Sequence, residues 1–473
     1  MSTERKRIVF SGVAVLAAGL AASLPGAPVG LNVVIAGWVL LVAVFLELRT
    51  QLTPVRLALL GVSATLFAAF LFRSAEWLWA LDVIGALAFA AWAALGVTTW
   101  RSLLVAATGS FFHLPKGVVF VLGPLLRWTG GLSSRRTAVL RTAGIVSLLL
   151  LVFGSLFASA DAAFASLAER YFVPEIEVGL LPARFLLGAA AIAAAGSLSL
   201  LPSIDVSASP WRLVRAGDRV RLSPAEWISG LVAIDLLFGA FVAVQIRALF
   251  GGHDWVLETA GLAYAHYARQ GFFQLVVVAV LTLGVIALAV RFARVDDAAR
   301  RWMRLLLGTL CILTLVILAS AWIRMNLYQE AYGFTRLRIL VDLTILWLAA
   351  VFLAVIVAGA RWKAAGLPRA VVALAAVALV GLNAYDPDAR IASLNIARYE
   401  RTGKLDLHYL EGLSLDAVPA LDALADEPRR CAFASMRDRL EHDPSLWSFN
   451  VARERARGLL QGEPALMPGP LTC

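Results

Sequence analysis

Long apolar stretches, each close to the length that crosses a lipid bilayer, constrain this chain more than any other feature. A membrane-spanning helix needs about 20 apolar residues. Eleven stretches approach that length: 8–24, 29–47, 54–72, 77–98, 138–160, 180–201, 225–250, 269–292, 303–325, 338–360 and 367–385. They predict an all-α, polytopic helical membrane protein with about eleven transmembrane helices in a domain covering residues 1–385. Only 16% of residues are charged, against about 25% in soluble proteins.

The distribution of charge indicates a membrane topology and argues against a nucleic-acid partner. Residues 386–473 hold 11 basic and 14 acidic residues, whereas the rest of the chain holds 31 basic and 18 acidic. The basic excess therefore lies in the short links between apolar stretches. Cytoplasmic loops of membrane proteins carry such an excess of Lys and Arg.

Assigning the links alternately to the two sides predicts the orientation. With the N-terminus inside, the cytoplasmic links collect 23 Lys and Arg and the external links before residue 386 collect eight. This split predicts a multi-pass protein of the bacterial cytoplasmic membrane, with the N-terminus cytoplasmic and the C-terminus extracytoplasmic. Two alternatives stay open. Stretch 8–24 resembles a signal peptide, although a retained first helix is favoured, and link 99–137 holds either interfacial helices or two short spans.

The tail, 386–473, is polar and contains residues that typically begin and end helices. Asp386 and Pro387 begin a predicted helix and Gly403 ends it. We expect four or five short helices packed as antiparallel hairpins, similar to a fragment of a helical-repeat module, in a small extracytoplasmic domain. Cys431 and Cys473 lie in this tail, so they either form a disulfide or remain two unpaired thiols.

Asp235 lies about ten residues inside its apolar stretch, near the bilayer midplane. An acid at that depth costs about 2.5–3.5 kcal/mol on insertion scales, so it should face the protein interior and have a partner. One reading makes Asp235 a proton- or cation-coupling residue. The other, favoured because no second midplane charge accompanies it, is a structural hydrogen bond to a neighbouring helix.

Polar residues that suit an anionic ligand cluster in two predicted external loops. Arginine on the external side runs against the insertion bias, and its guanidinium suits carboxylates and phosphates. The candidate binding residues are Arg247, His253, Asp254, Glu258, Tyr264, His266, Tyr267, Arg269, Arg324, Tyr328, Arg336 and Arg338. The ligand would be an anionic small molecule or a lipid headgroup. The alternative for most of them is internal pairing with Asp254, Glu258, Glu330 and Asp342, together with anchoring of Tyr and Trp at the membrane interface.

Sequence signatures of metal sites and of common catalytic sites are missing. There is no CxxC, HExxH, GxSxG or Walker A pattern. We therefore expect no metal and no cofactor, and an enzyme is not the favoured reading. If the chain is an enzyme acting on an anionic lipid or glycan precursor, then His253, Glu258 or His266 would be its general base.

Three segments resemble a known family. They are FGGHDWVLETAGLAYAHYARQGFFQL (Phe250 to Leu275), RMNLYQEAYGFTRLRIL (Arg324 to Leu340) and NIARYERTGKLDLHYLEGLSLDAVPAL (Asn395 to Leu421). Over roughly residues 75–460 the chain resembles the bacterial membrane family catalogued as domain of unknown function 4173. Such proteins typically carry an acid where this chain has His266. The resemblance implies a many-helix membrane protein with a helical tail, and it implies no activity.

The leading functional hypothesis is a non-enzymatic envelope sensor or scaffold acting through its external loops and tail. Its partners would be the lipid bilayer and an envelope protein that contacts the tail. The alternative is an ion- or proton-coupled transporter of a small solute, with Asp235 as the coupling residue and the external Arg and Tyr residues as a vestibule.

Overall fold

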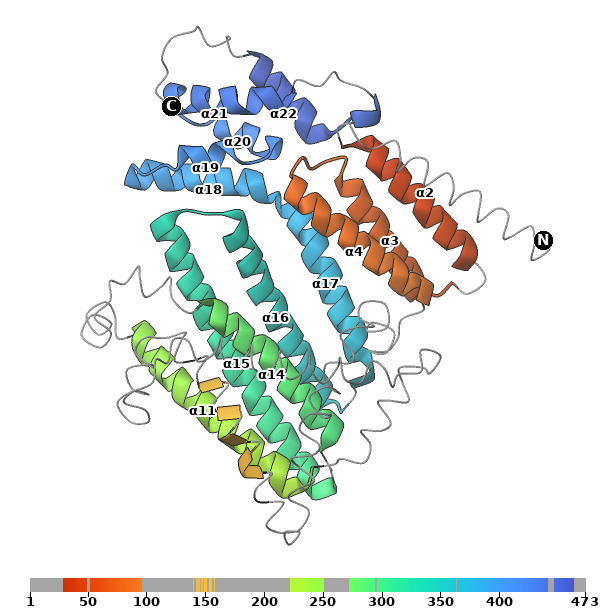
Figure 1. Ribbon diagram of the computed structural model, residues 1–473, viewed down its shortest axis with the longest axis vertical. Coiled ribbons are helices and arrows are strands. Elements are labelled where there is room, and N and C mark those ends of the chain that lie inside the picture. The colour runs from red at the N-terminus through yellow and green to blue at the C-terminus, as the bar shows by residue number, and fades with distance from the viewer. Residues whose placement is uncertain are drawn as a thin grey trace, which may run out of the picture. The chain divides into compact units, whose positions relative to one another are not determined.

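The computed structural model describes residues 29–48, 52–95, 222–250, 272–293, 296–362, 364–440 and 446–462, and scattered helical positions between 139 and 157 (Figure 1). Within these residues the secondary structure is helical, apart from an isolated bridge between Leu222 and Ala293. The prediction of an all-helical chain is confirmed for this part of the protein.

Among the described residues, eight apolar helices follow the stretches predicted to span the membrane, and they are called the membrane helices below after that prediction. They are α2 (Leu31–Leu48), α3 (Pro54–Ala69), α4 (Glu76–Leu95), α11 (Pro224–Phe250), α14 (Phe272–Phe292), α15 (Asp297–Tyr332), α16 (Arg336–Ala360) and α17 (Leu367–Tyr385), with the short η6 (Ala364–Gly366) before α17. In the described part of the chain, five helices are long and apolar enough to span a bilayer: Pro224–Gln245, Gln274–Phe292, Ala299–Tyr332, Arg336–Ala360 and Ala364–Tyr385. The protein is therefore a helical membrane protein.

The expected spans 8–24 and 180–201 lie outside the described residues, as does most of 138–160. The count of eleven spans thus stays a prediction.

Helix α15 extends beyond its expected span of 303–325. It has 36 residues, which at 1.5 Å per residue is about 54 Å and exceeds the thickness of a bilayer core. The segment Met325 to Ala331 contains no helix breaker, so the helix continues until Gly333, whose φ is +88°. The expected external loop between this span and the next is consequently only the link from Gly333 to Thr335.

The tail forms short helices, as its helix-starting and helix-ending residues predict. They are α18 (Pro387–Thr402), α19 (Leu407–Glu411), η7 (Leu415–Ala417), α20 (Val418–Leu421), α21 (Asp426–Arg437), η8 (Asp438–Leu440), η9 (Leu446–Ser448) and α22 (Val451–Gly462). Pro387 occupies the first turn of α18 and Gly403 caps its end with a φ of +67°. The group α18–α22 is called the C-terminal helices below.

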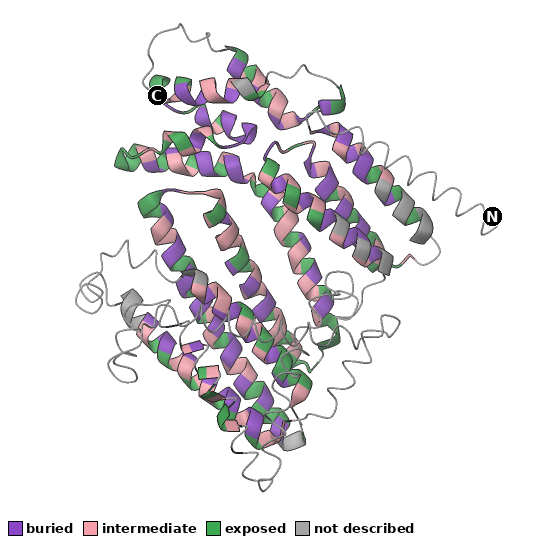
Figure 2. Ribbon diagram, in the orientation of Figure 1, coloured by how far each residue is buried: buried purple, intermediate pink, exposed green. Residues whose placement is uncertain are grey.

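The C-terminal helices share an apolar core with the ends of membrane helices. Phe433, Met436 and Leu460 are buried together with Leu78 of α4 and Ile339 of α16, and the inward faces of α20–α22 are buried in Figure 2. Burying such side chains contributes about 1.5–3 kcal/mol each. The contact is therefore part of the fold of this region.

Residue contacts divide the chain into two units. The first comprises residues 1–107, 332–343 and 368–473, and the second comprises 108–331 and 344–367. The C-terminal helices thus group with α2–α4, α17 and the first turns of α16. A domain boundary at residue 386, between a membrane domain of 1–385 and an extracytoplasmic domain, stays a prediction.

The second unit contains α11, α14, α15 and the remainder of α16. Phe157 stacks on Phe241 of α11, with ring centroids 4.0 Å apart. Apolar side chains lie on the surface of this unit, where Leu236, Leu288 and Ile312 are each more than half exposed. Apolar side chains facing outward suit a lipid environment.

Candidate functional site

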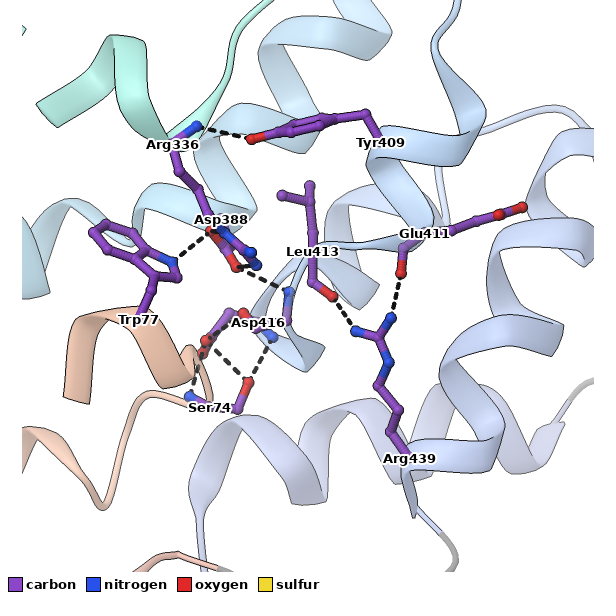
Figure 3. Close-up of polar contacts among 10 residues, drawn as sticks. Ser74, Trp77, Arg336, Asp388, Tyr409, Glu411, Leu413, Asp416 and Arg439 are labelled. Carbon is purple, nitrogen blue, oxygen red and sulfur yellow. Dashed lines mark hydrogen bonds and ion pairs between the residues drawn. The ribbon is translucent and has the colours of Figure 1, made fainter. Parts of the chain in front are cut away.

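Polar side chains from distant parts of the chain meet inside the first unit, in what we call the polar junction (Figure 3). It joins the α3–α4 turn, the start of α16, the start of α18 and the segment around η7. Its members are Arg73, Ser74, Trp77, Arg336, Asp386, Asp388, Tyr409, Ser414 and Asp416. Interior polar groups are costly unless they are hydrogen-bonded, so such a concentration calls for explanation.

Arg336 and Asp388 form the centre of the junction. The Arg336 guanidinium donates through Nε to Asp388 Oδ1 at 2.9 Å and through NH2 to Oδ2 at 2.5 Å. Asp388 also accepts from Trp77 Nε1 at 3.2 Å and from the Ser414 backbone N–H at 2.8 Å. The carboxylate is fully buried and its two oxygens share four donor contacts, an arrangement that stabilises a charged group away from water.

Asp416 holds the α3–α4 turn. Its Oδ2 accepts from the Ser74 backbone N–H at 2.9 Å, from Ser74 Oγ at 3.0 Å and from Ser414 Oγ at 2.8 Å. The Ser74 hydroxyl in turn accepts from the Asp416 backbone N–H at 3.0 Å. Arg439 donates to the carbonyls of Glu411 and Leu413, both at 2.6 Å, and so fixes the turn that carries Ser414.

A second ion pair joins the α3–α4 turn to the end of α17. Arg73 pairs with Asp386 and donates through Nε to the Asn383 carbonyl at 2.8 Å. The Asn383 amide donates to Asp82 Oδ1 at 2.7 Å. The acid Asp82 is fully buried in α4, so this chain of contacts carries polar groups from the junction into the membrane helices.

Two asparagines of the C-terminal helices form hydrogen bonds with backbone groups in the links between membrane helices. Asn395 of α18 accepts from the Phe334 N–H and donates to the Phe334 carbonyl, both at 2.9 Å. Only glycine fits at 333, because its φ is +88° and an added Cβ would lie 2.7 Å from Asn395 Oδ1. Buried Asn450 donates to the carbonyls of Phe70 and Arg73 at 2.8 and 2.9 Å.

The junction's carboxylates differ in proton affinity. Burial alone would raise the pKa of Asp388, but hydrogen bonding and charge from Arg336 outweigh it and lower that pKa. Burial raises the pKa of Asp416, partly offset by the hydrogen bonds from Ser414 and Ser74. Burial together with the charge of Asp416 raises the pKa of Asp386 to about 6, against the opposing charge of Arg73.

This raised pKa predicts that acidification stabilises the first unit. A carboxyl with a pKa of about 6 in the folded protein and 3.8 when unfolded binds a proton on folding between those values. Its ionisation therefore lowers the free energy of unfolding above pH 6 by at most about 3 kcal/mol, and that loss is relieved as pH falls from about 6 towards 3.8. Roughly 1.4 kcal/mol of it is recovered by pH 5. Asp388, with its lowered pKa, stays ionised throughout this range.

The measurement is the melting temperature of wild-type protein and Asp386→Asn between pH 5 and 7.5. Their difference isolates Asp386 from every other group of the protein that binds or loses a proton in the same range. The wild type should gain more stability on acidification than the variant. Parallel pH profiles would contradict the prediction.

Most of the predicted ligand cluster lies outside the described residues. His253, Asp254, Glu258, Tyr264, His266, Tyr267 and Arg269 all do, and no side chain is described for Arg247. A general base among His253, Glu258 and His266, and a ligand site in 251–271, remain predictions.

The described members of that cluster have separate surroundings. In the second unit, Arg324 is 1% exposed and donates to the side-chain oxygen of Gln245, while Tyr328 is half-buried. In the first unit, Arg336 pairs with Asp388, and Arg338 donates to the Gly333 carbonyl. Arg336 is thus paired internally, although with Asp388 rather than with an acid considered from the sequence, whereas Arg324 donates to an amide.

Asp235 lies in α11 of the second unit. Both of its carboxylate oxygens are buried, and no residue in the described part of the chain hydrogen-bonds to either. Asp235 therefore faces the interior of the packed helices, as expected from the free-energy cost of exposing an acid to lipid.

Sequence reasoning did not single out Asp388, Asp416, Ser74 or Asn395. One signal was available, because Arg73 and Arg336 lie in predicted external links, where arginine needs compensation. The acids considered for pairing were Asp254, Glu258, Glu330 and Asp342, all in or beside the same loops. The acids that pair with them instead, Asp386 and Asp388, come from the start of the tail.

The described residues contain no group of three or more His, Cys, Asp or Glu side chains that could hold a metal ion. The polar junction is accordingly a site of hydrogen bonds and ion pairs between Arg and Asp.

A family model described as Domain of unknown function (DUF4153) matches residues 57–424. The chain belongs to this family. The family number suggested by the resemblance, 4173, was therefore wrong, whereas an uncharacterised domain family was expected correctly. The DUF4153 match runs from α3 to just beyond α20, so it includes every member of the polar junction. No curated protein and no solved structure matches the chain.

Proposed function

We propose that this DUF4153 protein is a non-enzymatic scaffold of the bacterial cell envelope. It holds the C-terminal helices in a fixed position at the extracytoplasmic face of the cytoplasmic membrane, where an envelope protein binds them. The observation that carries the proposal is the polar junction. Buried Asp388 and Asp416 join the C-terminal helices to the ends of α4 and α16 through direct hydrogen bonds.

The contacts support a fixed position of the C-terminal helices on the membrane helices rather than attachment through a flexible linker. Asn395 and Asn450 bond the backbone of two separate links between membrane helices, and Val451 N–H donates to the Leu71 carbonyl at 2.7 Å. Each net hydrogen bond contributes about 0.5–1.5 kcal/mol, and leaving a buried partner unsatisfied costs more. Several such bonds with a shared core favour one orientation of the C-terminal helices.

The same contacts support the proposed topology. The start of α2, the α3–α4 turn, the α15–α16 link and the end of α17 all contact the C-terminal helices or their first residues. Alternate crossing with eleven spans assigns all four to the external side. An N-terminus inside and a C-terminus outside is our proposal, and it follows from the charge bias of the links.

In-cell photo-crosslinking tests the scaffold. A photoreactive amino acid at Arg430, exposed on α21, should give a discrete adduct with an envelope protein. The adduct should persist in Asp235→Asn and disappear in Arg336→Ala at equal protein level. Lipid-exposed Leu57 of α3 is the matched control position. If Arg430 and other exposed positions of the C-terminal helices yield no adduct, the scaffold proposal fails.

The second candidate is a proton- or cation-coupled transporter of a small solute. It is favoured by Asp235, whose buried carboxylate lacks a described hydrogen-bond partner. Reconstitution into vesicles with an internal pH dye tests it directly. Proton flux that Asp235→Asn abolishes, without a change in melting temperature, would support transport.

An extracytoplasmic tail predicts a disulfide between Cys431 and Cys473. Cys431 is buried in α21, and Cys473 lies outside the described residues. Protein purified under thiol-blocking conditions and then denatured should show a mass increase for one alkyl group without reductant and for three after reduction, because the chain has three cysteines. Three alkylations without reductant would contradict the pairing and weaken the assignment to an oxidising compartment.

A further inference from the structure

The largest anomaly on the surface of the first unit is a group of apolar side chains on η9 and beside it. Leu446 is 83% exposed, Trp447 59% and Phe449 39%, whereas Ser448 between them is buried. The rest of the C-terminal helices place charged and polar residues outward and apolar ones in the core. Side chains of this size gain nothing from exposure to water, so a contiguous group marks an interaction surface.

The backbone of this segment is fixed to the first residues of α2. The Leu31 N–H donates to the Phe449 carbonyl at 3.0 Å. Arg453 bridges the two segments by donating to the Ser448 carbonyl at 2.7 Å and to the Val29 carbonyl at 3.2 Å. At Gly30 an added Cβ would lie 2.5 Å from the Phe449 carbonyl oxygen, so the two backbones meet without an intervening side chain.

The same segment contacts the end of α3. Asn450 and Val451, directly after Phe449, bond the carbonyls of Phe70, Leu71 and Arg73. Phe72, in the turn that they hold, is itself 51% exposed. We call Phe72, Leu446, Trp447 and Phe449 together the interfacial patch.

The position of the interfacial patch determines what covers it. It lies within one hydrogen bond of the residue at which α2 begins, and α2 is the second expected membrane span. Further along α2, Trp38, Val42 and Phe45 are exposed at helical spacing of four and three residues, which is a lipid-facing stripe. A patch at the end of such a helix lies at the level of the lipid headgroups, where Trp is enriched.

We infer that the interfacial patch inserts into the boundary between headgroups and acyl chains of the adjoining leaflet, so that the C-terminal helices rest on the lipid surface as well as on the membrane helices. The exposed cation Arg455 follows on α22, and a cation beside an inserted apolar group suits a surface containing anionic lipid. The inference requires α2 to span the bilayer and is independent of the scaffold function.

Site-specific fluorescence of the full chain in vesicles tests the inference. An environment-sensitive fluorescent amino acid replaces Leu446 in one variant and Glu427, an exposed charged residue of α21, in the other. The vesicles contain phosphatidylethanolamine and phosphatidylglycerol with a nitroxide near the top of the acyl chain. The probe at 446 should show blue-shifted emission and quenching by the nitroxide lipid, and the probe at 427 should be quenched by aqueous iodide.

Three outcomes would overturn lipid insertion. One is quenching of the 446 probe by iodide as strongly as the 427 probe. Another is protection from both quenchers that disappears when the protein is diluted in lipid, which would indicate a second copy. The last is protection from both quenchers at every dilution, which would indicate coverage by the protein itself.

A Trp447→Ser variant with a probe at 446 provides a second measurement. Since Trp447 is outside the apolar core, the variant should keep the wild-type melting temperature in detergent. Its probe should lose part of the blue shift in vesicles. An unchanged blue shift, with the same melting temperature, would also count against insertion.

Discussion

Replacing Arg336 with Ala should release the C-terminal helices from the ends of the membrane helices. Asp388 would then remain fully buried without its bidentate partner. Removing one member of a buried ion pair typically costs about 3–5 kcal/mol, mostly because the other charge stays unpaired. We expect a lower melting temperature and faster tryptic cleavage within α18, which carries Arg390, Arg398 and Arg401.

Two further variants separate this effect from a general loss of an arginine. Arg401→Ala removes an exposed cation of α18 and should be nearly neutral. The double variant Arg336→Met with Asp388→Leu removes both charges, so it should be more stable than Arg336→Ala alone. An Arg336→Ala variant as stable and as protease-resistant as Arg401→Ala would show that the ion pair contributes little.

Phe433→Ala should unfold the C-terminal helices themselves. Phe433 is 2% exposed and lies in the core with Met436, Leu421 and Leu460. Truncating a buried Phe costs about 3–5 kcal/mol, because transfer energy is lost and a cavity remains. Hydrogen exchange should accelerate in α18–α22, while the amides of α15 before Tyr332, in the other unit, keep their protection.

The matched variant is Phe433→Leu, which keeps most of the volume and should cost less than about 1.5 kcal/mol. Equal acceleration in α15 and in the C-terminal helices would contradict the prediction, because it would mean that the two units unfold together. Faster exchange confined to α21 would indicate local fraying only.

Sequence reasoning predicted the membrane helices well because their signal is local. Each apolar stretch contains its own evidence, and the bounds of α11, α16 and α17 differ from the expected spans by no more than two residues. The end of α15 was misplaced for an equally local reason. Polarity was taken as the end of the helix, whereas a helix continues through polar residues until its backbone is broken, here at Gly333.

The polar junction was beyond this kind of reasoning. Ser74 and Asp416 are separated by more than 300 residues, and Asp388 by itself resembles an ordinary acid in the first turn of a helix. Only the tertiary contact reveals that these acids satisfy Arg336 and the α3–α4 turn. The sequence did indicate that arginines in predicted external links need compensation. A single sequence does not show which acid provides it.

The two asparagine contacts have a consequence for biosynthesis. Ribosomes make the α3–α4 turn about 380 residues before Asn450, which donates to the carbonyls of Phe70 and Arg73. Membrane insertion can thus be complete while these carbonyls still depend on water. A chain whose translation stops before residue 450 lacks these bonds however well its helices are inserted, so it leaves two carbonyls, of Phe70 and Arg73, without the amide that satisfies them.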